Sequence, residues 1–106
     1  MTSVLDRFLR YVRYDTQSDE RSRSYPSTDK QLVLLRDLTD ELRAAGLDDA
    51  VMDEYGYVMA TIPATTRKAN VPIIGFIAHV DTSPEMPGAG VKPIVIEARQ
   101  PSVTGQ

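Results

Sequence analysis

Apolar and polar positions follow a helical period near the start of the chain. Four apolar residues recur at the spacing of one helical face: Leu5, Phe8, Leu9 and Val12. Just before them, Ser3 is followed three positions later by Asp6, which resembles a capping box, the pairing that satisfies open amide groups at a helix start. This pattern predicts a first helix over residues 4–13. The polar stretch over residues 15–27 has no period and predicts an exposed loop.

A second helical pattern follows the loop. Thr28 with Gln31 three residues later offers a helix start, and Gly46 stands where the first residue beyond a helix end usually lies. Between them an apolar stripe repeats at helical spacing: Leu32, Leu35, Leu38 and Leu42, widened by Val33 and Leu34. We expect this stripe to pack into the core rather than to bind a partner.

The second half of the chain is rich in residues that favour strands. Two such runs, at residues 50–55 and 57–62, are joined near Gly56 and suggest a hairpin. The run "IIGFIA" at residues 73–78 is almost wholly apolar, as expected of a strand buried on both faces. A last apolar run at residues 92–98 suggests another strand. The order helix, helix, hairpin, strand favours an α/β fold with a parallel or mixed sheet.

Composition narrows the choice of function. The chain has 106 residues, a formal net charge of −3 and no cysteine. Acids and bases are scattered, which argues against a nucleic-acid partner. No stretch is long enough to span a bilayer, and charged residues interrupt the apolar N-terminus, unlike a secretion signal. We therefore expect a cytoplasmic protein without a membrane partner, in which any metal site must use imidazole and carboxylate ligands.

The chain's one histidine directly follows the apolar run. His79 lies at the predicted carboxyl end of the strand, where ligands of α/β sheets gather. Asp81, two positions on, projects to the same side in extended backbone and can accept the second ring N–H of a metal-bound histidine. The alternatives are a simple ion pair and a Ser-His-Asp hydrolase that uses Ser83. The second alternative is disfavoured because no G-x-S-x-G elbow surrounds Ser83.

Resemblance to a known family favours a metal site at His79 over the two alternatives. The motif "AHVDTSPE" resembles the first metal-site motif of the peptidase T family, the tripeptide aminopeptidases among the two-zinc exopeptidases. Three other segments are similar to that family's N-terminal part in order and spacing: "RFLRYVRYDTQSDE", "YPSTDKQLVLLRDLTDELRAAGL" and "YGYVMATIPA". The resemblance covers nearly all of residues 5–97. It implies that residues 1–106 are the incomplete N-terminal portion of one zinc-peptidase catalytic domain with a mixed sheet.

Two site residues follow from this resemblance. It makes His79 a ligand of one of two zinc ions and Asp81 the catalytic-site carboxylate that orients His79. The resemblance also implies that the remaining ligands and the glutamate base come from beyond Gln106. One histidine cannot hold a catalytic zinc, which needs about three protein ligands, so we expect this chain alone to be inactive. Glu85 is interpreted as a solvated loop carboxylate.

Two functions of different class stay open at this point. The first is an N-terminal fragment of a zinc-dependent aminopeptidase that releases the N-terminal residue from tripeptides. The second is a non-catalytic α/β module that acts through binding or self-association, because a shortened sheet would leave an unpaired edge and apolar surface.

Overall fold

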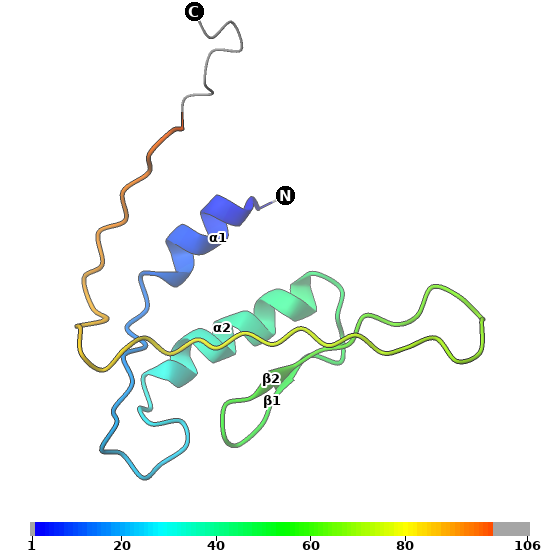
Figure 1. Ribbon diagram of the computed structural model, residues 1–106, viewed down its shortest axis with the longest axis horizontal. Helices are drawn as coiled ribbons and strands as arrows, with labels where there is room; N and C mark the ends of the chain where they lie inside the picture. Colours follow the sequence, from blue (N-terminus) through cyan, green and yellow to red (C-terminus); the bar gives the residue numbers. More distant parts are fainter. Residues whose placement is uncertain (1, 99–106) are drawn as a thin grey trace, which may run out of the picture.

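The computed structural model describes residues 2–98, which form two helices and a small antiparallel sheet (Figure 1). The order is α1 (Val4–Tyr11), α2 (Gln31–Ala44), β1 (Val51–Met52) and β2 (Val58–Met59). This arrangement agrees with an α/β fragment and with the predicted order of helix, helix and hairpin. Residues 99–106 lie outside the described residues.

Helix α1 begins with the predicted capping box. The Ser3 hydroxyl accepts a hydrogen bond from the Asp6 backbone N–H at 3.0 Å, and the Asp6 carboxylate accepts one from the Ser3 backbone N–H at 3.2 Å. The helix ends at Tyr11, two residues before the predicted end. None of its residues is buried, and Val4 and Phe8 are more than half exposed. Its apolar face therefore does not form part of the core.

Helix α2 begins three residues after the predicted N-cap. Lys30 stands at the N-cap position, and its side chain makes no capping hydrogen bond to the helix backbone. The reason is that the Thr28 hydroxyl donates instead to the Gln17 carbonyl at 2.8 Å and accepts from the Gln31 side-chain amide at 2.9 Å. The helix start predicted from Thr28 and Gln31 therefore lies slightly too early, since the Thr28 side chain bonds to the loop and not to the helix backbone.

The end of α2 is as predicted. Gly46 has φ +103°, a conformation that favours glycine, and its N–H donates to the Arg43 carbonyl. The Leu47 N–H donates to the Leu42 carbonyl at 3.0 Å. These two bonds form a Schellman motif, which satisfies carbonyl groups left open at the helix end.

The hairpin packs against α2 (Figure 1). Its register pairs Val51 with Met59, and a turn closed by a bond from the Gly56 N–H to the Asp53 carbonyl joins the strands. A Cβ on Gly56 would lie 3.0 Å from a Leu35 methyl carbon, so glycine allows the turn to approach the helix closely. The buried apolar residues lie on α2 and just before β1: Leu34, Leu35 and Ala50. The predicted packing of the α2 stripe is therefore confirmed in part: Leu34 and Leu35 are buried, but Val33 is 51% exposed. The other stripe residues are half-buried: Leu32, Leu38 and Leu42.

The predicted buried strand at residues 73–78 does not form. Ile73, Phe76 and Ile77 are 96–100% exposed, and the segment is extended chain without a strand partner among the described residues (Figure 1). A strand buried on both faces needs neighbouring strands and covering layers, and residues 2–98 supply neither at this position. Residues 92–98 also form no strand, for the same reason.

The described residues as a whole are less compact than a typical domain. The radius of gyration is 18.4 Å, whereas a compact domain of about 100 residues has about 13 Å. The described residues therefore form an open arrangement around one small core. Neither of the helices found in residues 2–98 has the length and apolar character needed to cross a membrane.

Candidate functional site

His79 and Asp81 meet in the extended segment that follows residues 73–78. The imidazole Nδ1 lies 2.9 Å from Asp81 Oδ1, and the two side chains are 84% and 42% exposed. The predicted approach of Asp81 to His79 is therefore confirmed. A carboxylate accepts hydrogen bonds, so the contact favours the tautomer with the proton on Nδ1 and leaves the Nε2 lone pair free. The role of His79 as a metal ligand stays a prediction.

The backbone just after Asp81 is attached to the loop that follows α1. The Thr82 N–H donates to the Thr16 carbonyl and the Ser18 N–H donates to the Thr82 carbonyl, both at 3.0 Å. Gln17 and Thr82 thereby form an isolated parallel bridge. This bridge joins the candidate site to the N-terminal part of the chain.

Side chains strengthen this attachment. The Ser18 hydroxyl donates to the Thr82 carbonyl at 2.8 Å, and the Gln17 side-chain amide donates to the Pro84 carbonyl at 3.0 Å. Sequence reasoning gave residues 15–18 no role beyond an exposed loop. The stretch carries no period or motif that would indicate a partner 64 positions away.

The contacts of Ser83 and Glu85 can be compared with the roles that the sequence suggested for these two residues. The Ser83 hydroxyl accepts the Glu85 backbone N–H at 3.3 Å, and no hydrogen bond within residues 2–98 joins Ser83 to His79. A serine triad therefore has no support in the geometry. The Glu85 residue is exposed, in agreement with a solvated loop carboxylate.

The described residues fit a zinc site only in part. His79 Nε2 is suited to bind zinc because imidazole nitrogen is a usual zinc ligand and Asp81 occupies the other ring nitrogen. No group of three His, Asp or Glu side chains able to hold a metal occurs between residues 2 and 98. This part of the chain therefore offers one candidate ligand, His79, with a carboxylate hydrogen-bonded to its other ring nitrogen.

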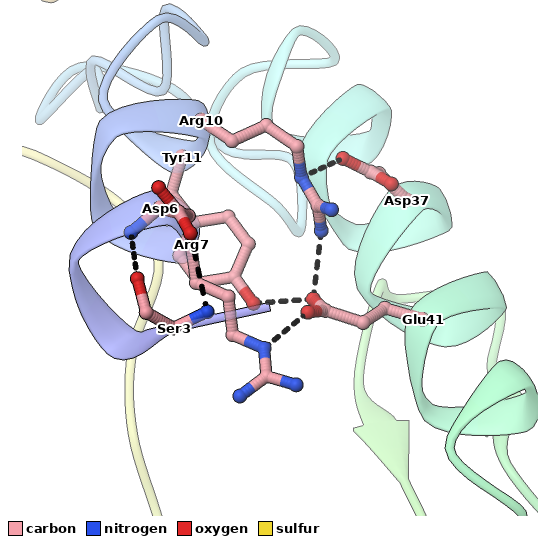
Figure 2. Close-up of polar contacts among 7 residues, drawn as sticks. All are labelled: Ser3, Asp6, Arg7, Arg10, Tyr11, Asp37 and Glu41. Carbon is pink, nitrogen blue, oxygen red and sulfur yellow. Dashed lines mark hydrogen bonds and ion pairs between the residues drawn. The ribbon is translucent and has the colours of Figure 1, made fainter. Parts of the chain in front are cut away.

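A second polar cluster joins α1 to α2 (Figure 2). Glu41 accepts hydrogen bonds from Arg7 Nε at 2.7 Å, from Arg10 Nη2 at 2.8 Å and from the Tyr11 hydroxyl. Arg10 Nε also lies 3.3 Å from Asp37 Oδ2, in an ion pair that does not align as a hydrogen bond. These contacts attach α1 through polar groups rather than through its apolar face.

The cluster shifts the acid–base behaviour of its central pair. Burial of the phenol, with its hydrogen bond to Glu41, raises the pKa of Tyr11 to about 12. Burial alone would raise the pKa of Glu41, but hydrogen bonds from Tyr11 and Arg7 and the nearby positive charges lower it. The cluster therefore favours a protonated phenol that donates to an ionised carboxylate, and this bond joins α1 to α2.

Comparison with known proteins gives a consistent answer. No protein-family model matches this chain. Peptidase T of Halothermothrix orenii is 54% identical over 97 residues, which are 92% of this chain and 24% of that protein. Peptidase T of Clostridium acetobutylicum is 55% identical over 93 residues, or 88% of this chain and 22% of that protein. Peptidase T of Geobacillus thermodenitrificans is 54% identical over 94 residues, or 89% of this chain and 23% of that protein.

The chain thus spans about a quarter of the length of these relatives. That share agrees with the N-terminal portion that the motifs resemble. The resemblance to peptidase T is therefore confirmed over about nine-tenths of this chain.

Proposed function

We propose that this chain supplies the N-terminal part of the catalytic domain of a cytoplasmic, zinc-dependent aminopeptidase that releases the N-terminal residue from tripeptides. The observation that carries the proposal is the 54–55% identity to peptidase T over about nine-tenths of the chain. The contact between His79 and Asp81 inside the resembling motif supports it. The fold of the whole enzyme would be the mixed-sheet domain of the two-zinc exopeptidases.

Each site residue has a defined task in this proposal. Asp81 accepts the Nδ1 proton of His79, which fixes the ring and makes the free Nε2 more basic. Nε2 of His79 then binds one of two zinc ions. When bound, zinc lowers the pKa of a water molecule and polarises the substrate carbonyl. In the overall hydrolysis, the hydroxyl of water goes to the carbonyl carbon and a proton goes to the leaving amine.

The proposal assigns the remaining ligands and the glutamate base to sequence outside residues 2–98. Those residues contribute a single imidazole, and a catalytic zinc needs about three protein ligands. We therefore expect the 106-residue chain by itself to bind zinc weakly and to hydrolyse no peptide.

A hybrid enzyme tests the proposal. The matching segment of the Geobacillus thermodenitrificans peptidase T is replaced by residues 1–98 of this chain, and folding is checked by circular dichroism. We expect the hybrid to split trialanine into alanine and a dipeptide in the presence of zinc. We expect His79→Ala to lose nearly all of this activity, whereas the control Glu85→Gln keeps it. A folded hybrid that is inactive with zinc, or one that tolerates His79→Ala, would contradict the proposal.

A second candidate function has its own observation. Residues 73–77 expose Ile73, Phe76 and Ile77 almost completely, and no backbone hydrogen bond joins residues 73–78 to other described residues. An extended apolar segment with unpaired N–H and C=O groups pairs readily with another chain. The 106-residue chain is therefore a candidate for self-association, with a second copy along this segment.

A further inference from the structure

We propose that residues 15–18 position the His79–Asp81 pair, with Gln17 and Ser18 as positioning residues. They fix the backbone directly after Asp81 and thereby determine where its carboxylate meets the imidazole. The consequence for zinc affinity rests on the proposed function, but the positioning itself concerns only the contacts within this chain.

The first argument is that, within the described residues, backbone hydrogen bonds attach the candidate site only on its C-terminal side. Between residues 69 and 81, no backbone hydrogen bond connects the segment to other described residues. The first attachment is at Thr82, whose N–H and carbonyl bond to Thr16 and Ser18. Asp81 is the residue immediately before this point, so its position depends on the bridge. His79, in turn, depends on Asp81, which is its hydrogen-bond partner.

The second argument is that side chains reinforce the bridge at two places. The Thr82 carbonyl accepts both the backbone N–H and the hydroxyl of Ser18, at 3.0 Å and 2.8 Å. Gln17 reaches two residues farther, where its amide donates to the Pro84 carbonyl at 3.0 Å. The segment after Asp81 is therefore held at two carbonyl groups, those of Thr82 and Pro84.

The third argument is that residues 15–18 are themselves fixed. Asp15 accepts the Gln17 N–H at 3.1 Å and forms an ion pair with Lys30 at 2.9 Å, at the start of α2. The Thr28 hydroxyl donates to the Gln17 carbonyl at 2.8 Å, and Thr16 is only 3% exposed. Residues 15–18 therefore connect the start of α2 to the backbone beside the candidate site.

Gly88 also lies against residues 15–17. A Cβ built there would lie 2.5 Å from Asp15 Oδ1 and 3.1 Å from the Gln17 nitrogen. The chain thus returns to residues 15–17 after leaving Thr82. Contacts on both sides of Pro84 hold the loop that follows the candidate site against one short segment.

The histidine itself provides the test, because the chain has only one. In ¹⁵N-labelled protein at about pH 9, the ring nitrogen signals of His79 report which nitrogen carries the proton. We expect the Nδ1-protonated form to dominate in the unaltered chain. In the double variant Gln17→Ala/Ser18→Ala, we expect the ratio to shift toward the Nε2-protonated form on the order of threefold or more.

The matched control is Ser22→Ala/Ser24→Ala, which removes hydroxyls from the same loop that bond each other and Pro26 but not residues 79–88. This control should leave the tautomer ratio unchanged. The single variant Ser18→Thr, which keeps a hydroxyl, should have the same tautomer ratio as the unaltered chain. If the double variant does not fold, Ser18→Ala alone is measured. An unchanged ratio in whichever of the two variants folds would overturn the positioning role.

The zinc consequence is measured on the hybrid enzyme. We expect the double variant to weaken zinc affinity by about tenfold, the lower end of the range for partners that orient a metal ligand. Unchanged zinc affinity, in a hybrid whose zinc does depend on His79, would overturn the inference. If His79→Ala leaves the zinc content unchanged, the proposed function fails, and the tautomer ratio alone decides the positioning role.

Discussion

At the scale of residues, the candidate site consists of two side chains with complementary tasks. His79 offers a nitrogen to solvent, and Asp81 occupies the other nitrogen of the same ring at 2.9 Å. Both side chains lie at the surface of the described residues, so the site is open to the ligands that a zinc ion would still need. The exposure of the pair is compatible with the proposed half of a metal site, and a simple ion pair at the surface has the same geometry.

Asp81→Asn tests the carboxylate's share of this arrangement. Asparagine keeps the size of the side chain but loses the charge that makes His79 more basic, so zinc affinity of the hybrid enzyme should fall by roughly ten- to a hundredfold. Equilibrium dialysis against a zinc chelator measures this change. A decrease of less than about twofold, equal to that of the Glu85→Gln control, would show that Asp81 does not act through the metal ligand.

At the scale of elements, α1 and α2 are connected by polar contacts and α2 ends in a glycine motif. The α1 contacts centre on Glu41, which three side chains of α1 approach: Arg7, Arg10 and Tyr11 (Figure 2). Because the apolar face of α1 is not buried, these contacts determine how the helix lies on α2. The position of α1 should therefore depend on pH.

The sign of this dependence follows from the two pKa shifts. The pKa of Tyr11 is raised from 10.0 to about 12, so its stabilising contribution is present below pH 10 and is lost as pH rises toward 12. The pKa of Glu41 is lowered, so its contribution is present above the ordinary glutamate range and is lost at lower pH. The 295 nm absorbance difference between the unaltered chain and Tyr11→Phe should titrate near pH 12. A midpoint near pH 10 would contradict the Tyr11–Glu41 contact.

Gly46 provides a prediction for the end of α2. Its φ of +103° is strained for any residue with a Cβ, although no atom within 4 Å would clash. Gly46→Ala should therefore lower the free energy of unfolding by about 1–2 kcal/mol, measured by urea denaturation. The control is Gly75→Ala, at a glycine without positive φ and with open surroundings, which should change stability by less than about 0.5 kcal/mol. Equal effects of the two substitutions would contradict this interpretation.

At the scale of the whole molecule, one small core carries a long extended segment. The apolar residues at 73–77 and 94–96 are exposed, and the radius of gyration is 18.4 Å. A chain of this kind buries less apolar surface than a compact domain of equal length, so its exposed segments favour contact with other surfaces. In a complete peptidase T-like enzyme, we expect additional strands to cover them.

Self-association of the 106-residue chain can be measured by sedimentation velocity over a range of concentrations. We expect the sedimentation coefficient to rise with concentration, and Phe76→Lys to reduce this rise because it places a charge in the segment that would be buried. Tyr57→Lys changes an exposed aromatic residue in the hairpin and should have little effect. A monomer at all concentrations would contradict the predicted association.

Local features of the fold were predictable from the sequence, and distant contacts were not. The capping box of α1, the glycine end of α2 and the hairpin each depend on residues within a few positions of one another. The strand at 73–78 was predicted wrongly because burial on both faces depends on neighbours, which the described residues do not provide. Its apolar composition alone does not decide its environment.

In the candidate site, too, the local contact was predictable from the sequence and the distant contacts were not. The contact of His79 with Asp81 was predictable because two positions in extended chain bring side chains to one side. The bonds from Gln17 and Ser18 were not predictable, since they join segments more than 60 positions apart and use residues common in any loop. Only the spatial arrangement shows that the loop after α1 is connected to the motif.

The most direct test of the central claim is the zinc content of the hybrid enzyme with and without His79. After removal of loosely bound metal, we predict about two zinc ions per hybrid chain and about one in His79→Ala, because the imidazole is a ligand of one of the two ions. The same zinc content in both proteins would contradict the assignment of His79 as a metal ligand, and with it the proposed role of this chain in a zinc aminopeptidase.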